Sequence, residues 1–124
     1  MDIAVNHLWK SYDGTPVLED FSCSIPRGSC CALLAPSGAG KTTLLRLLLG
    51  LEQPDRGEIT GVPHRCAAVF QEDRLFPGLC AVSNVTAATS CSRGEATALL
   101  SRLGLEDESQ KKPVRLLSGG QARR

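Results

Sequence analysis

The pattern of apolar and polar positions predicts a strand-rich first part of the chain and a helical second part. Apolar and polar residues alternate weakly around Ile3 and Val5 and clearly over residues 21–25. Such alternation predicts strands with one solvated face, as in a small antiparallel sheet. The runs 30–34 and 66–70 are apolar at every position, which predicts strands buried on both faces of a parallel sheet. The first part of the chain is therefore expected to form a mixed sheet.

A helix is expected after the glycine-rich stretch 36–40. Five leucines follow with the spacing of a largely buried helix: Leu44, Leu45, Leu47, Leu48 and Leu49. Gly50 is suited to end this helix in a left-handed conformation. Beyond it, residues 54–57 are typical of a turn, and residues 58–60 are expected to form a short strand.

The second part of the chain carries a clear helix start signal. Ser92 and Glu95 have the spacing of a capping box, in which each residue's side chain accepts from the other's backbone N–H. The apolar residues that follow share one helix face: Ala96, Leu99, Leu100 and Leu103. Gly104 is expected to end this helix, and the charged segment 106–112 is expected to be a loop.

Composition and charge narrow the class of protein. The chain has 124 residues, a net charge of +1, 42% hydrophobic residues and 4% aromatic residues, which fits one modest domain or a piece of a larger one. The near-neutral charge argues against a polybasic nucleic-acid arm. No apolar run approaches the ~20 residues of a membrane span, and the N-terminus has no basic segment followed by an apolar core. A cytosolic chain is the expectation.

The six cysteines raise the alternative of a disulfide framework or a metal site. No two of them are separated by two residues, and the chain has only two histidines, His7 and His64. We therefore expect the cysteines to be free and to act as small hydrophobic residues in apolar stretches. They are Cys23, Cys30, Cys31, Cys66, Cys80 and Cys91.

Gly40, Lys41 and Thr42 form the end of a Walker A pattern, which binds phosphate. A strand that ends in a flexible loop lets backbone N–H groups point at phosphate oxygens, and the helix that follows adds its positive N-terminal end. Lys41 is expected to reach the β- and γ-phosphates, and the Thr42 hydroxyl to ligate Mg²⁺. The alternative is a chance glycine turn before a leucine-rich helix.

The pattern departs from the motif at one position, where Ala35 stands in place of a glycine. Alanine adds one methyl group and is costly only where the backbone needs a positive φ. We expect the loop to tolerate this change.

A second candidate anion site lies near the C-terminus. Ser118 and Gln121 have capping-box spacing, and Gly119 and Gly120 lie between them, so first-turn N–H groups are left uncovered. An ordinary helix cap is the alternative explanation for this segment.

Taken together, these segments resemble ATP-binding-cassette (ABC) ATPases over nearly the whole chain. Residues 117–121 resemble the signature motif of that family, and residues 35–43 resemble its phosphate loop apart from Ala35. Tyr12 matches the aromatic residue that stacks on adenine, and Gln71 matches the Q-loop glutamine, which contacts Mg²⁺ or the attacking water. Residues 70–77 and 82–85 look like those of nitrate, sulfonate and taurine importer ATPases.

The resemblance implies an α/β fold: a P-loop NTPase core with an N-terminal antiparallel β-subdomain within residues 1–72 and a helical subdomain within residues 73–124. It implies ATP and Mg²⁺ as ligands, catalytic roles for Lys41 and Gln71, and metal contacts from Thr42 and Gln71. The residues expected to bind the nucleotide are Tyr12, Ala35, Pro36, Ser37, Gly38, Ala39, Gly40, Lys41, Thr42, Thr43, Ser118, Gly119, Gly120 and Gln121.

The resemblance also implies partners and a location. Two ABC domains, expected to be a homodimer, would bind ATP between one phosphate loop and the other domain's signature. A transmembrane permease subunit would hold the pair at the cytoplasmic face of the membrane, and nucleic acid is not expected as a partner. A soluble ABC protein of translation or DNA repair is an alternative, which the near-neutral charge argues against.

In the family, an acidic pair at the end of a strand and a histidine follow the signature, and phosphoryl transfer depends on such groups. Neither feature is present between the signature segment 117–121 and Arg124. The expectation is therefore the N-terminal part of a transporter ATPase that hydrolyses ATP poorly as it stands, with a non-catalytic nucleotide-binding fragment as the alternative.

Overall fold

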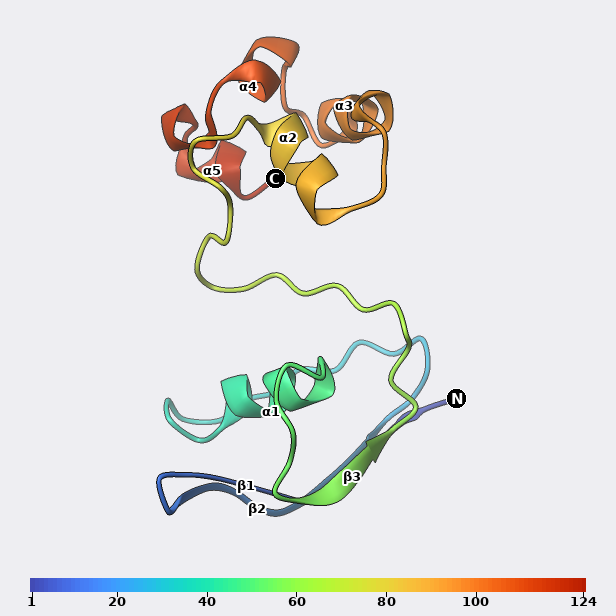
Figure 1. The fold of residues 1–124 in the computed structure, drawn as a ribbon. Helices are drawn as coiled ribbons and strands as arrows, with labels where there is room; N and C mark the ends of the chain where they lie inside the picture. Colours follow the sequence, from blue (N-terminus) through green and yellow to red (C-terminus); the bar gives the residue numbers. More distant parts are fainter. The chain divides into compact units, whose positions relative to one another are not determined.

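The computed structural model describes residues 1–124 and contains two compact units, Met1–Ala68 and Val69–Arg124 (Figure 1). The first unit holds a three-stranded sheet and one helix, and the second is built from short helices. Each unit has a hydrophobic cluster of its own. The units are therefore described one at a time.

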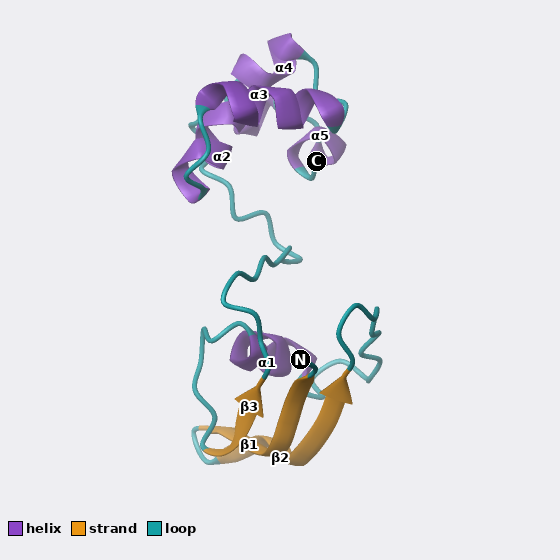
Figure 2. Cartoon of the chain, turned by 90° about the vertical axis from the view of Figure 1, so that its right-hand side faces the viewer, coloured by secondary structure: helices purple, strands orange, loops and turns teal.

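The sheet of the first unit consists of β1 (Ile3–Tyr12), β2 (Thr15–Ile25) and β3 (Arg56–Thr60), in the order β2-β1-β3. Both pairings are antiparallel, so the prediction of a small antiparallel sheet is confirmed (Figure 2). A tight turn at Asp13 and Gly14 joins β1 to β2. Both turn residues have positive φ, 50° and 77°, which suits an Asp-Gly hairpin turn.

The helix α1 (Lys41–Leu48) packs on this sheet. The core lies between them and consists of three sheet residues and two helix residues, Val5, Leu8, Leu18, Leu44 and Leu47. Gly50 has a φ of 68° just beyond the helix, so the predicted left-handed stop is confirmed. This packing matters for function because the residues that precede α1 belong to the predicted phosphate loop.

The second unit contains α2 (Ala81–Ala88), α3 (Arg93–Arg102), α4 (Asp107–Lys111), the 3₁₀ turn η1 (Val114–Leu116) and α5 (Gly119–Ala122). Its core consists of Ala81, Val82, Ala96, Leu100 and Leu105. The capping box of α3 is confirmed: the Ser92 N–H donates to Glu95 Oε2 at 2.8 Å, and the Glu95 N–H donates to Ser92 Oγ at 3.2 Å.

Two expectations about this unit were wrong in detail. Leu99 and Leu103 were expected to share one apolar helix face with Ala96 and Leu100 but are 47% and 48% exposed, because the buried face of α3 is narrow and centres on Ala96 and Leu100. The expected loop at 106–112 contains the short helix α4. Gln110 explains this helix, since its buried amide donates to Leu105 O at 2.8 Å and to Ser101 Oγ at 2.9 Å.

The two fully apolar runs do not form strands. Residues 30–34 and 66–70 have no strand structure and pair with no other segment. Leu34 is 89% exposed and Val69 is fully exposed. A buried parallel strand depends on neighbouring strands and on helices over both faces, and neither run has a neighbouring strand in this chain. Cys30, Cys31 and Cys66 lie on these runs and are therefore exposed instead of buried.

Candidate functional site

The loop before α1 is shaped by two glycines. Gly38 and Gly40 have φ values of 84° and 85°, a left-handed conformation that disfavours other residues. Gly40 also lies against β2, because a Cβ placed there would lie 3.0 Å from Val17 Cγ1 and 3.1 Å from Leu18 Cδ2. The sheet therefore holds the end of the loop at the start of α1, and a larger residue at Gly40 would be strained and would crowd β2.

Backbone N–H groups of this loop are free to bind an anion. The amides of Lys41, Thr42 and Thr43 at the start of α1 have no acceptor, since the first bond of the helix runs from the Leu44 N–H to Gly40 O at 2.9 Å. No side chain caps this helix, and no acidic residue lies in its first turn. Uncapped amides at a positive helix end form a ready site for phosphate oxygens.

The Lys41 ammonium adds a positive charge within the same loop. Its Nζ donates to the carbonyl oxygens of Ala35 at 2.6 Å and Pro36 at 2.7 Å. The ammonium therefore lies on the inner side of the curved loop backbone. Because lysine has three donors on a flexible stem, the same group can also donate to phosphate oxygens at this place.

The remaining loop residues differ in exposure. Ser37, Ala39 and Thr42 are exposed, so the Thr42 hydroxyl is accessible to a ligand. Thr43 is 9% exposed and belongs to the buried side of α1. The predicted phosphate-binding residues therefore divide into a solvated set and one residue that faces the interior.

Ala35 does not distort the loop. Positive φ among non-glycine residues occurs only at His7, Asp13 and Asp20. The backbone at Ala35 thus requires no glycine, which explains how the loop forms despite its departure from the motif.

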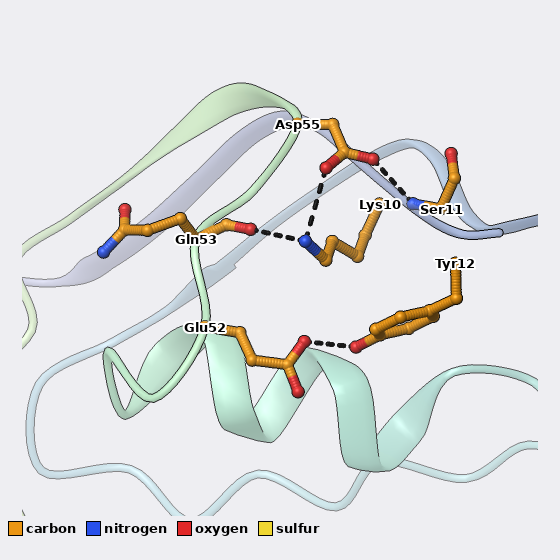
Figure 3. A network of polar contacts seen from close by, with 6 residues as sticks. All are labelled: Lys10, Ser11, Tyr12, Glu52, Gln53 and Asp55. Atoms are coloured by element: carbon orange, nitrogen blue, oxygen red, sulfur yellow. Dashed lines mark hydrogen bonds and ion pairs between the residues drawn. The ribbon is translucent and has the colours of Figure 1, made fainter. Parts of the chain in front are cut away.

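Tyr12 lies in the same unit as the phosphate loop, at the end of β1, and is 38% exposed. Its hydroxyl donates to Glu52 Oε2 (Figure 3). The other oxygen of that carboxylate, Oε1, accepts from Arg46 Nη1 of α1 at 3.3 Å. Lys10 lies over the Tyr12 ring, with Nζ 5.5 Å from the ring centroid.

Lys10 is itself held by two acceptors from the segment that precedes β3. Its Nζ donates to Gln53 O at 2.9 Å and to Asp55 Oδ1 at 3.3 Å (Figure 3). The Ser11 N–H donates to the other oxygen of Asp55 at 2.7 Å. The hydrogen bond from Ser11 first, and the hydrogen bond and positive charge of Lys10 next, lower the pKa of Asp55 below its ordinary value. This network could not be predicted from the sequence, because Glu52 and Asp55 are 40 or more residues from their partners on β1.

The second unit holds the other predicted site residues. Gln71 is exposed in a segment without regular structure. Ser118 caps α5: its Oγ accepts from the Gln121 N–H at 3.2 Å, and Gln121 Oε1 accepts from the Ser118 N–H at 3.0 Å. The predicted capping box is therefore confirmed. The predicted residues fall in two units, with Tyr12 and the phosphate loop in the first and Gln71 and the signature in the second.

Gly119 and Gly120 have no structural reason to be glycine. Neither has a positive φ, and a Cβ on either would meet no atom within 4 Å. Alanine favours helices over glycine by about 1 kcal/mol per residue. Glycine is therefore unfavourable for this chain's own folding at both positions, which is consistent with a surface that an external group approaches closely.

The chain forms no metal cage of its own, since no three His, Cys, Asp or Glu side chains gather in one place. The Thr42 hydroxyl and the Gln71 amide oxygen are both exposed oxygen donors. Mg²⁺ prefers oxygen ligands and is usually bound by one or two protein groups together with substrate phosphates. These two residues fit that donor chemistry.

Comparison with known proteins decides the family. Residues 18–124 match the protein family described as ABC transporter. The chain belongs to the ABC transporter family. This ABC chain is 42% identical to the aliphatic sulfonates import ATP-binding protein SsuB 1 of Nocardia farcinica, over 98% of this chain and 50% of that protein. It is 36% identical to the spermidine/putrescine import ATP-binding protein PotA of Legionella pneumophila, over 98% of this chain and 38% of that protein.

The fold of a solved ABC transporter cassette supports the same family. The ABC chain resembles the dimeric structure of MJ0796, described as a bacterial ABC transporter cassette, with a TM-score of 0.78 and 25% identity over 97% of this chain and 65% of that one. The predicted ABC ATPase fold class is therefore confirmed. The chain spans about half the length of the sulfonate-import relatives it matches. None of its helices has the length and apolar character needed to cross a membrane.

Proposed function

We propose that this chain binds ATP through the phosphate loop 35–43 as part of the ATP-binding subunit of an ABC importer. The observation that carries this proposal is the uncapped start of α1, where the amides of Lys41, Thr42 and Thr43 lack acceptors beside the Lys41 ammonium. Such an array matches the charge and the several oxygens of a triphosphate. Membership of the ABC transporter family supports the same reading.

Each loop residue has a role in this proposal. Lys41 moves its ammonium from the Ala35 and Pro36 carbonyls to the β- and γ-phosphate oxygens, and the loop amides bind the remaining oxygens. Thr42 and Gln71 would each offer an oxygen ligand to Mg²⁺, and the ion would supply neutralisation of the charge that develops on the phosphates. Gln71 also contacts the attacking water, and Tyr12 stacks on the adenine ring.

The signature segment binds the nucleotide of a second ABC domain. Gly119 and Gly120 leave open space at the start of α5, so a γ-phosphate can approach the backbone there, with Ser118 and Gln121 beside it. The two domains are a homodimer in this proposal. The structural relative MJ0796 supports it, because that cassette was solved as a dimer.

The proposed importer role is supported by the names of similar proteins. Proteins named for aliphatic sulfonate import and for spermidine/putrescine import are both similar to nearly the whole chain. The proposal therefore places the subunit at the cytoplasmic face of the membrane, bound to a transmembrane permease. Residues 1–72 supply the β-subdomain and the phosphate-loop core, and residues 73–124 supply the helical subdomain with the signature.

A nucleotide-binding fragment without hydrolytic activity is the second candidate. The observation that favours it is the exposure of Leu34 and Val69 on two apolar runs without strand partners. A chain in this state binds phosphates through its loop but does not present a complete catalytic centre.

Titration of the 124-residue chain with a fluorescent ATP analogue tests the binding proposal. Lys41→Ala should weaken binding about tenfold or more, since hydrogen bonds to charged groups contribute about 1.5–3 kcal/mol. Lys112→Ala is the matched control, because Lys112 forms only a surface ion pair with Glu108 at 2.9 Å. Equal affinity for the wild type and Lys41→Ala would overturn the assignment of the phosphate loop. Measurement of phosphate release distinguishes the two candidates.

A further inference from the structure

The Glu52 carboxylate joins an aromatic ring on the sheet to the helix that follows the phosphate loop. Its Oε2 accepts from the Tyr12 hydroxyl, and its Oε1 accepts from Arg46 Nη1 at 3.3 Å. Tyr12 ends β1, Arg46 lies on α1, and the Glu52 side chain is 23% exposed. Each oxygen thus has its own donor, and the carboxylate bridges two elements that otherwise meet through the hydrophobic core.

The Tyr12 ring is constrained at a second point. Lys10 Nζ lies over the ring at 5.5 Å from its centroid, and the Lys10 side chain is only 16% exposed because Gln53 and Asp55 hold it. This ammonium takes one face of the ring (Figure 3). A flat ligand can therefore stack only on the other face.

We propose that Glu52 is a positioning residue that holds the Tyr12 ring ready to stack on a nucleotide base, an inference that rests on the proposed binding of ATP at the phosphate loop. Without the Glu52 contact, the ring of a partly exposed tyrosine at a strand end samples several rotamers. Immobilising such a side chain on binding costs conformational entropy. A ring that is already held avoids this cost.

Arg46 extends the same device to the phosphate end of the ligand. It lies five residues after Lys41 on α1, and its ion pair with Glu52 ties the position of the ring to the helix whose first turn binds phosphate. The base and the phosphates of one nucleotide are thereby received by groups at a set separation. The affinity contributed by Glu52 should accordingly appear only with ligands that carry a base.

The test compares ATP with inorganic tripolyphosphate, which has the phosphates but no base. Dissociation constants are measured for the wild type, Tyr12→Phe, Glu52→Ala and the double variant. Tyr12→Phe keeps the ring and removes only the hydroxyl. Glu58→Gln is the matched control, since Glu58 is an exposed sheet glutamate that accepts a hydrogen bond from Asn6 at 3.4 Å.

Each single variant should weaken ATP binding about three- to tenfold. Tripolyphosphate binding should remain within twofold of the wild type. The double variant should lose no more ATP affinity than either single variant does, because both changes break the same contact. Glu58→Gln should bind both ligands as the wild type does.

Other results overturn the inference. If the affinity for tripolyphosphate falls by the same factor as the affinity for ATP, the role of Glu52 is purely structural. Additive losses in the double variant would show that Glu52 acts independently of Tyr12. If Glu52→Ala does not fold, the affinities of Tyr12→Phe alone test the inference. Wild-type ATP affinity in Tyr12→Phe would contradict it. Failure of the wild type to bind either ligand would instead contradict the proposed function, and this inference with it.

Discussion

The Lys41 ammonium donates to the carbonyl oxygen of Ala35 at 2.6 Å. Ala35 is the one position at which the phosphate loop departs from the glycine pattern. It holds Lys41 through its backbone carbonyl, and its side chain is exposed. Because the backbone φ at Ala35 is not positive, the extra methyl group imposes no conformational strain.

We therefore expect Ala35→Gly to leave ATP affinity within about twofold and to lower stability by about 0.5 kcal/mol, since glycine adds conformational freedom to the unfolded chain. Gly40→Ala should instead weaken ATP binding and lower stability further, because Gly40 has a φ of 85° and a Cβ there would lie 3.0 Å from Val17 Cγ1. Nucleotide titration and urea unfolding of both variants check this. A clear gain in affinity for Ala35→Gly would contradict the account of the loop.

Replacing the signature glycines should separate folding from function. Gly119→Ala and Gly120→Ala should each stabilise the second unit, by about 0.5 kcal/mol, because alanine favours the helix and its methyl group meets no atom within 4 Å. The same variants should weaken ATP-dependent self-association, as followed by sedimentation velocity. Gly78→Ala is the matched control, since Gly78 is also open and has no positive φ. Unchanged association in both signature variants would contradict the proposed role of this segment.

The capping box of α3 should make the stability of this helix depend on pH. Hydrogen bonds from the Ser92 backbone N–H and then from the Ser92 hydroxyl lower the pKa of Glu95 below its ordinary value of 4.5. The native state therefore binds the Glu95 proton less readily than the unfolded state does, so this contribution to stability is present above pH 4.5 and is lost as pH falls through the lowered pKa. Hydrogen exchange at α3 amides should show this acid loss in the wild type and not in Glu95→Gln. Equal pH profiles in the two proteins would contradict it.

Asn84 should be important for the stability of the second unit. It is 7% exposed, its Oδ1 accepts from the Phe76 N–H at 2.7 Å, and its Nδ2 donates to Phe76 O at 3.1 Å and Cys80 O at 3.2 Å. Asn84→Ala should destabilise this unit by about 2 kcal/mol, because it leaves the Phe76 N–H without its acceptor and removes the side-chain hydrogen bonds to the Phe76 and Cys80 carbonyls. Hydrogen exchange at α2 amides measures the effect. Asn6→Ala, at an exposed asparagine, should cost little, and an equal cost in both variants would refute this role.

Features set by neighbouring residues were predictable from the sequence. The glycine stop at Gly50 and the capping box between Ser92 and Glu95 formed as expected, because the atoms that make them lie within a few residues of one another. Features that depend on distant partners were not predictable. The run 30–34 has the composition of a buried strand, but no segment of the chain pairs with it.

The candidate site shows the same division. The candidate phosphate loop was predictable from Gly40, Lys41 and Thr42 because the spacing of its motif is local. The Glu52 contact with Tyr12 was missed, since a glutamate after a helix is usually solvated and only the tertiary fold brings these two side chains together. Gln110 was missed for a similar reason, because its burial follows from the packing of α4 and not from any apolar pattern.

The most direct test of the central claim is the response of backbone amide resonances to ATP in an NMR titration of the ¹⁵N-labelled chain. The account predicts saturable shifts concentrated at Gly38, Gly40, Lys41 and Thr42, and their loss in Lys41→Ala. Binding of ATP that leaves these amide resonances in place would contradict the assignment of the phosphate loop as the nucleotide site.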